Sequence, residues 1–263
     1  MNILQILFQT SLGKKYVMAV TGLILVGFII GHLVGNLQIF FPPDNINAYA
    51  HFLQGLGGAL WLVRFALLAA LILHVYVSIR LVLENKAARG GSGYADQKTL
   101  KASYASRTMK YSGPIVFFFI LYHLLHFTVR GDFLGATVPE TTLADGTPVH
   151  DIHSMMVIAF QDVWVSLAYI FSIGLLSVHL SHGLSSMFQS LGLRTRTWSS
   201  VLQKAAVVVS VLYFLGNLAI PAAVMAGAVK VQNPDAIVAS ACAACDACPI
   251  AKGLVVVSEE ANP

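Results

Sequence analysis

Charged residues are scarce in this sequence, because Asp, Glu, Lys and Arg together make up only 11% of its 263 residues. Soluble globular domains carry about a quarter charged residues. The hydrophobic share is 57% and the mean hydropathy is +0.73, so there is too little polar surface to cover a compact particle of this size in water. The composition therefore excludes an ordinary soluble enzyme and indicates a protein that faces lipid.

The sequence also has few cysteines: there are three, Cys242, Cys245 and Cys248, and all lie near the C-terminus. No disulfide framework can therefore hold the rest of the chain together. Their spacing is typical of part of an iron–sulfur cluster motif, but the fourth cysteine is missing. Pro249 stands where covalent haem attachment requires histidine. For this tail, residues 230–263, three interpretations stay open: one disulfide with a leftover thiol, a metal site completed by another chain, and an incidental extension.

Five apolar stretches are each long enough to cross about 30 Å of hydrocarbon at about 1.5 Å per helical residue. We therefore expect an all-α membrane protein with a bundle of five transmembrane helices over residues 1–229 and the tail at 230–263. The stretches run over residues 16–40, 59–83, 111–129, 155–181 and 201–229.

Basic residues are distributed unevenly among the segments that join these stretches. With the N-terminus inside, the inner segments hold 12 of the 16 basic residues and two acids, Glu84 and Asp96, whereas the outer segments hold the other ten acids. Short cytoplasmic loops of membrane proteins carry such an excess of Lys and Arg. We therefore expect a cytoplasmic N-terminus and an external C-terminus, in a multi-pass protein of the cell's inner (cytoplasmic) membrane. Since the net charge of +4 belongs to these loops, nucleic acid is not an expected partner.

Histidines are concentrated in the apolar stretches, where ionisable side chains are costly and normally face the interior of the bundle. No Asp or Glu lies deep in any stretch to pair with them, which weakens the interpretation as a proton relay or a carboxylate-bridged metal site. Neutral imidazoles suit haem, a ligand that supplies its own charge and a large apolar body. Six of the nine histidines lie there: His32, His74, His123, His126, His179 and His182.

The depth of each histidine along its helix predicts which of them share an iron. His32 and His123 lie toward the outer side, whereas His74 and His179 lie toward the inner side. We therefore expect two haems b stacked across the membrane, with the axial pairs His32/His123 and His74/His179. At about 1.5 Å per residue, the two layers should be on the order of 10–20 Å apart.

Two His-x-x-His pairs, His123/His126 and His179/His182, favour an alternative metal site, because residues three apart share a helix face. The two helices run in opposite directions, so the second histidine of each pair lies toward an opposite face of the membrane. A single four-histidine site is therefore disfavoured. We expect His126 and His182 to form hydrogen bonds or to lie beside haem propionates, although either could replace its neighbour as a ligand.

Several segments, taken in order over about residues 10–225, resemble the cytochrome b558 subunit of bacterial succinate dehydrogenase/fumarate reductase. Each piece alone is weak, but the ordered set on four helices is specific. The segments are Gly31-His32-Leu33-Val34-Gly35-Asn36, Asn47-Ala48-Tyr49-Ala50-His51-Phe52, Leu73-His74-Val75-Tyr76, Tyr122-His123-Leu124-Leu125-His126 and Val178-His179-Leu180-Ser181-His182-Gly183-Leu184.

The resemblance implies a five-helix membrane anchor that binds two haems b through His32, His74, His123 and His179. It also implies a flavoprotein subunit and an iron–sulfur subunit on the cytoplasmic face, and electron exchange with a membrane quinone. Dicarboxylate chemistry would then take place on the flavin of the partner. This chain would be a non-catalytic electron-transfer subunit that contributes the quinone site.

A quinone needs a lipid-accessible apolar slot with a polar group for each carbonyl. His51 and Arg64 are the candidates near the outer haem, with Asp44 as a further one. Arg64 could equally be a snorkelling anchor or a propionate partner, and His51 could cap a helix. Two other classes of protein stay open: the haem b anchor of another membrane oxidoreductase, of the hydrogenase or formate dehydrogenase type, and a haem-free histidine-rich transporter.

Overall fold

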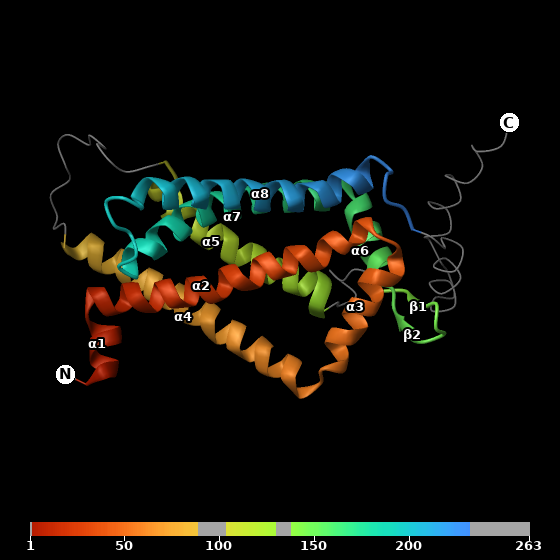
Figure 1. Cartoon of the computed structure of the whole chain (residues 1–263), viewed down its shortest axis with the longest axis horizontal. Helices are drawn as coiled ribbons and strands as arrows, with labels where there is room; N and C mark the ends of the chain where they lie inside the picture. Colours follow the sequence, from red (N-terminus) through yellow and green to blue (C-terminus); the bar gives the residue numbers. More distant parts are fainter. Residues whose placement is uncertain (1, 89–103, 130–137, 232–263) are drawn as a thin grey trace.

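Five long helices form the body of the computed structural model, which describes residues 2–88, 104–129 and 138–231 (Figure 1). Each is long and apolar enough to cross a membrane. The 27 residues of the last one span about 40 Å. The expected helical bundle with five membrane-spanning helices is therefore confirmed. The five are α2 (Ser11–Asn36), α4 (Gly58–Ala88), α5 (Tyr104–Leu124), α7 (Val163–Ser190) and α8 (Ser199–Met225).

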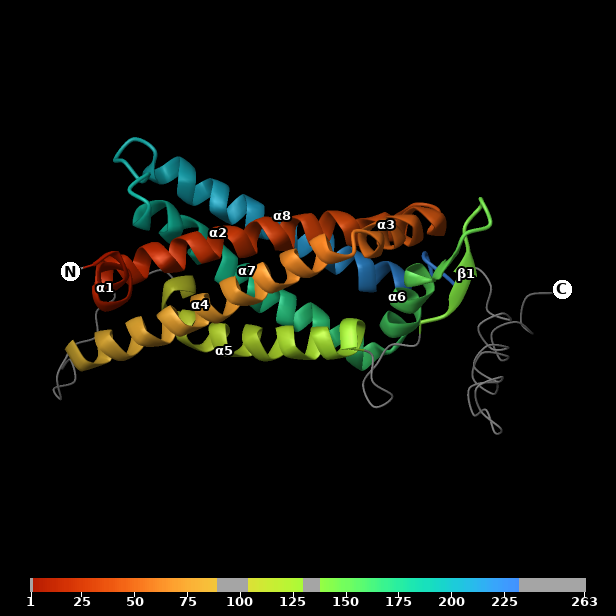
Figure 2. The same cartoon turned by 90° about the horizontal axis from the view of Figure 1, so that it is seen from below.

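Shorter elements continue or connect these helices. A 3-10 turn, η1 (Leu37–Phe40), extends α2, and a π-helical turn, η2 (Leu125–Val129), extends α5. Figures 1 and 2 place α1 and the α7–α8 connection at one end of the bundle, and α3, α6 and a β-hairpin at the other. The remaining bounds are α1 (Ile3–Gln9), α3 (Pro43–Gly55), α6 (Ile152–Gln161), β1 (Glu140–Thr142) and β2 (Pro148–His150).

The fourth span differs from the expected range of 155–181, because the chain breaks at Asp162. This residue has extended backbone, and its carboxylate accepts hydrogen bonds from the backbone N–H groups of Trp164 and Val165 at 2.8 and 3.1 Å. An N-cap of this kind satisfies donors that have no partner inside the helix, so it starts a new helix at Val163. The apolar residues before Asp162 form the separate helix α6, and the span continues to Ser190.

The segment before α6 contains an antiparallel hairpin in its described part, which begins at residue 138. Thr141 pairs with Val149 across β1 and β2. The turn between the strands holds Gly146 at φ +85°, a left-handed conformation that glycine adopts without strain. Asp145 accepts a hydrogen bond from the backbone N–H of Thr147 at 2.9 Å, and this bond is the main cause of its lowered pKa.

Helix packing leaves much apolar surface outside the bundle. α2 packs against α4 and α7, α5 packs against α7, and α7 packs against α8. Large apolar side chains on the outward faces, among them Leu62, Phe118, Phe171 and Leu212, are 62–71% exposed. In water such a surface would be unfavourable, whereas in a bilayer it faces hydrocarbon. The molecule is therefore a multi-pass membrane protein.

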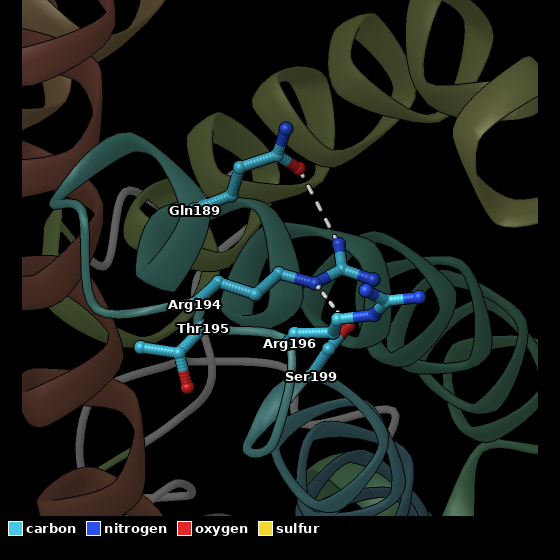
Figure 3. A pocket seen from close by; sticks show the side chains of 5 residues that line it. All are labelled: Gln189, Arg194, Thr195, Arg196 and Ser199. Carbon is cyan, nitrogen blue, oxygen red and sulfur yellow. Dashed lines mark hydrogen bonds between the residues drawn. The ribbon is translucent and has the colours of Figure 1, made fainter.

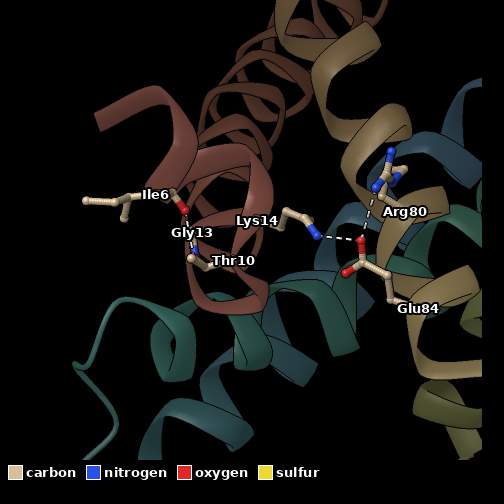
Figure 4. Close-up of polar contacts among 6 residues, drawn as sticks. All are labelled: Ile6, Thr10, Gly13, Lys14, Arg80 and Glu84. Carbon is tan, nitrogen blue, oxygen red and sulfur yellow. Dashed lines mark hydrogen bonds and ion pairs between the residues drawn. The ribbon is translucent and has the colours of Figure 1, made fainter. Parts of the chain in front are cut away.

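One end of the bundle holds a buried lysine. Lys14 is only 3% exposed and forms an ion pair with Glu84 of α4, which also lies 3.4 Å from Arg80 (Figure 4). At the same place α1 folds back onto α2 at Gly13, where a Cβ would lie 2.1 Å from the carbonyl oxygen of Ile6. Only glycine permits this approach, so the N-terminal turn and the ion pair join α1, α2 and α4 at this end.

We expect Glu84→Gln to lower the midpoint of thermal unfolding by several degrees in detergent. The substitution leaves the buried ammonium of Lys14 without a carboxylate partner, and an uncompensated buried charge is strongly destabilising. The matched control is Lys86→Gln, at an exposed position near the end of the same helix. Equal midpoints for the two variants would show that the ion pair contributes nothing to stability.

Candidate functional site

Two histidines from helices far apart in the sequence lie side by side; among the protein atoms His123 is half-buried and His32 is exposed. The ring centroids of His32 on α2 and His123 on α5 lie 5.7 Å apart, and their planes are almost perpendicular at 84°. Phe28 stacks on His32 at 5.4 Å, and Phe119 and Phe127 lie 6.1 and 5.6 Å from His123. Apolar rings therefore contact both of these imidazoles, here called the outer pair.

The hydroxyl of Tyr169 on α7 lies between two imidazoles of this region. It is 3.0 Å from Nδ1 of His126 and 3.4 Å from Nδ1 of His123. A phenol has one hydrogen, so it can donate to only one of these imidazoles and accepts in any other bond. His126, at the start of the π-helical turn, is itself buried and stacks on Tyr122 at 5.4 Å. The hydrogen bonds of Tyr169 thus couple the states of His123 and His126.

His74 of α4 lies against α2 about three turns before His32, at the level of Thr21. Its Nδ1 is 3.1 Å from Oγ1 of Thr21, and the same hydroxyl lies 2.8 Å from the carbonyl oxygen of Val17. Because the hydroxyl hydrogen is used by that carbonyl, Thr21 accepts from the Nδ1–H of His74, and Nε2 keeps its lone pair. A Cβ on Gly22 would lie 3.4 Å from Cε1 of His74, so this glycine lets the ring approach α2.

His179 of α7 has a matching environment. Its Nδ1 lies 3.4 Å from the hydroxyl oxygen of Ser112 on α5, and that hydroxyl also lies 3.5 Å from the carbonyl oxygen of Met109. His179 and His74, here called the inner pair, are close enough for their charges to interact. Both histidines of the inner pair thus have a hydroxyl at Nδ1, each from a different helix.

Hydroxyl and imidazole groups are spaced along the helices by three turns, or about 10.8 residues. Residues 11 apart nearly share a face, residues ten apart are turned by about 80°, and the rise of about 1.5 Å per residue separates either pair by about 15–16 Å. Each of the helices α2, α5 and α7 therefore carries a histidine of one pair and a hydroxyl that supports the other pair. The spacings are 11 residues for Thr21 and His32 on α2, 11 for Ser112 and His123 on α5, and ten for Tyr169 and His179 on α7.

Thr21, Ser112 and Tyr169 were missed from the sequence. The sequence signal for such residues is a hydroxyl side chain deep in an apolar helix, about three turns from a histidine on the same helix. Serine and threonine alone are common in transmembrane helices, where they bond to the preceding turn of their own helix. The contacts with histidines on other helices depend on how the helices pack, so the sequence does not show them.

The outer pair fits a group bound between two imidazoles. A bond from a metal to an imidazole nitrogen is about 2 Å long, so two axial imidazoles have ring centres roughly 6 Å apart. The observed 5.7 Å matches this separation. Beside His32, a Cβ on Gly27 or Gly31 would meet no atom within 4 Å, which leaves room for a flat macrocycle. The residues present therefore fit a haem with two histidine ligands.

A site with more protein ligands gains no support. Among the described residues, no three or more His, Cys, Asp or Glu side chains come together in an arrangement that could hold a metal ion. The two histidines of the pair His123/His126 also have different surroundings: both contact the hydroxyl of Tyr169, and His123 in addition contacts the ring of His32. Cys242, Cys245 and Cys248 lie outside the described residues.

The candidate quinone residues have separate neighbours. The guanidinium of Arg64 lies over the ring of Trp61 at 4.9 Å, on the exposed side of α4. His51 is exposed on α3 and lies near enough to Asp145 of the hairpin turn to interact with its charge. Asp44 accepts a hydrogen bond from the backbone N–H of the hairpin residue Ala144 at 3.2 Å. The role of His51 and Arg64 at a quinone stays a prediction.

A polar junction at this end holds α3 against α6. Asn47 is 2% exposed; its amide donates to Asp151 at 3.1 Å and its oxygen accepts from the backbone N–H of His153 at 3.1 Å. Asp151 also caps α6 through the N–H of Ser154. His153 is buried, and burial lowers its pKa. The junction fixes the position of the connection that follows η1.

Comparisons of the chain with protein-family models, curated proteins and solved structures gave no match.

We expect Tyr169→Phe to lower the free energy of unfolding by about 1–3 kcal/mol, because it leaves the buried Nδ1 of His126 without its hydrogen-bond partner. Thermal or denaturant unfolding in detergent measures the change. Tyr76→Phe, which removes an exposed hydroxyl from α4, is the matched control. If both variants unfold alike, the Tyr169 hydroxyl does not hold the two histidines.

Proposed function

We propose that this chain is the membrane-anchor cytochrome b subunit of a succinate:quinone oxidoreductase. It would bind two haems b, one between His32 and His123 and one between His74 and His179. The observation that supports the proposal best is the approach of two imidazoles from α2 and α5 to 5.7 Å, in surroundings of aromatic rings and glycine. The ordered resemblance to the cytochrome b558 subunit adds the identity of the enzyme.

The inner pair is prepared for axial ligation by its hydrogen bonds. A histidine that binds a metal usually donates its other ring N–H to a fixed acceptor, which sets its tautomer and orientation. Thr21 supplies that acceptor for His74, and Ser112 supplies it for His179. Nε2 of both imidazoles would then be the atom that holds the iron.

The hydroxyl of Tyr169 distinguishes His123 from His126. If His123 binds through Nε2, its proton is on Nδ1, so Tyr169 accepts from His123 and donates its only hydrogen to Nδ1 of His126. His126 then carries its proton on Nε2 and has no free lone pair. This arrangement supports the proposal that His123 is the ligand and that His126 orients it through Tyr169.

Haem b at each layer would supply a one-electron redox centre. The protein would contribute two ligands per centre, a separation of about 16 Å between layers, and apolar side chains beside the ligands. Phe28, Phe119 and Phe127 provide those side chains at the outer pair. No catalytic side chain is proposed for this chain.

The proposed topology follows from the distribution of charge. The N-terminus, α1 and the α7–α8 connection would face the cytoplasm, with the C-terminus outside, in the inner membrane of the cell. The flavoprotein and iron–sulfur subunits would dock at the cytoplasmic end. A membrane quinone would exchange electrons at the opposite end, where His51 and Arg64 are the proposed contacts.

The first experiment measures haem. We expect the full chain, purified with any subunits it retains, to contain two haems b per chain, with an α-band that appears on reduction. Pyridine haemochrome quantification against protein concentration provides the number. One haem per chain would require another class of membrane oxidoreductase, and no haem would overturn the proposal.

The second experiment tests the pairing. We expect His32→Ala and His123→Ala to lose the same haem, and His74→Ala and His179→Ala to lose the other, because each iron needs both of its axial ligands. Redox titration of the remaining haem identifies which one is left. His150→Ala, on the exposed strand β2, should keep both. If His32→Ala and His74→Ala leave the same haem, the layered pairing is wrong.

A further inference from the structure

The connection between α7 and α8 forms an open polar pocket at the end of the bundle that also holds α1 (Figure 3). The pocket has a volume of about 490 Å³. Its walls come from the last turn of α7, the connecting segment and the first residue of α8, and they contain no carboxylate. The lining residues are Gln189, Arg194, Thr195, Arg196 and Ser199.

Neutral groups hold one of the two arginines in place. Nε of Arg194 donates to the hydroxyl oxygen of Ser199 at 2.8 Å, and Nη1 donates to Oε1 of Gln189 at 3.3 Å. These bonds orient the guanidinium without neutralising its charge. A guanidinium has five N–H donors, so Arg194 keeps further donors for a ligand.

The described residues form no ion pair that balances the positive charge of the pocket. Within the described ranges, ion pairs join Glu84 to Lys14 and Arg80, and neither Arg194 nor Arg196 takes part in one. Arginine stays protonated at every physiological pH, and its planar fork matches the oxygens of a phosphate group. A pocket with two such groups and no acid therefore selects an anion with several oxygens.

The surroundings of the pocket decide where that phosphate comes from. The connection joins two membrane-spanning helices, so the pocket lies at the level of the lipid headgroups. Leu193 and Trp198 stand beside the arginines and are 56% and 58% exposed. Apolar and aromatic side chains next to a basic pocket suit a ligand that is part anion and part hydrocarbon, whereas free phosphate gains nothing from them.

We propose that the pocket of Arg194 and Arg196 binds the phosphate of an anionic phospholipid. The lipid headgroup would lie between the two guanidinium groups, and its acyl chains would run along the apolar outer face of α7 and α8. This site would anchor the α7–α8 connection at the membrane surface. It is independent of haem and of the enzyme to which the chain belongs.

Lipid titration of the full-length chain tests the proposal. The delipidated protein in detergent is titrated with dioleoylphosphatidylglycerol or with dioleoylphosphatidylcholine, and native mass spectrometry counts the bound lipids. We expect the anionic lipid to bind more tightly. Each arginine removed should weaken it about fivefold, so Arg194→Gln/Arg196→Gln should lose roughly 25-fold.

The matched control is Lys204→Gln. It removes the same charge from an exposed position near the start of α8 but does not line the pocket. We expect less than a twofold effect. Arg196→Gln alone provides a second variant that keeps the bonds of Arg194 to Ser199 and Gln189, and unchanged thermal unfolding shows that it is folded.

Three results would overturn the proposal. Equal affinities of the pocket variants and Lys204→Gln for the anionic lipid would show that only general charge attraction holds the lipid. Complete displacement of the anionic lipid by an equal concentration of inorganic phosphate would assign the pocket to the free anion. Unchanged lipid affinity, together with loss of co-purifying polypeptides in the pocket variants, would make the arginines a protein contact.

Discussion

A polar group inside a lipid-embedded bundle must find its partner within the protein, and this requirement organises the interior of the molecule. Water is absent from the hydrocarbon region, so an imidazole that faces the bundle interior needs another side chain or a backbone group. Thr21, Ser112 and Tyr169 meet this need for His74, His179 and the pair His123/His126. Each bond crosses from one helix to another. The same contacts that satisfy the histidines therefore hold the helices in register.

The hydroxyl groups also connect the two layers of histidines. Because three helical turns separate a histidine from the hydroxyl on its own helix, a helix that places an imidazole in one layer supports an imidazole in the other. The two layers are thus mechanically linked through α2, α5 and α7. A shift of any one of these helices along its axis would disturb both layers at once. Such linkage suits a pair of redox centres whose separation has to stay constant.

Polar residues at the ends of the bundle set the limits of the helices. Asp162 ends α6 and caps α7, and Asp151 caps α6 while it bonds to Asn47. At the opposite end, the ion pair of Lys14 and Glu84 joins α2 to α4. These groups lie where the apolar spans stop. Together they place the helices relative to one another in depth, which packing of smooth apolar surfaces alone would leave poorly defined.

The number of spans and the presence of histidines within them followed from the sequence by itself, because apolar length and the positions of ionisable residues are local properties of the chain. The break at Asp162 was missed, since its capping bonds depend on a backbone conformation that an unbroken apolar pattern conceals. Only the tertiary structure decided that His32 lies 5.7 Å from His123, and that Tyr169 lies between His123 and His126. Such contacts join residues far apart in the chain, and their distances depend on the rotation and depth of every helix at once.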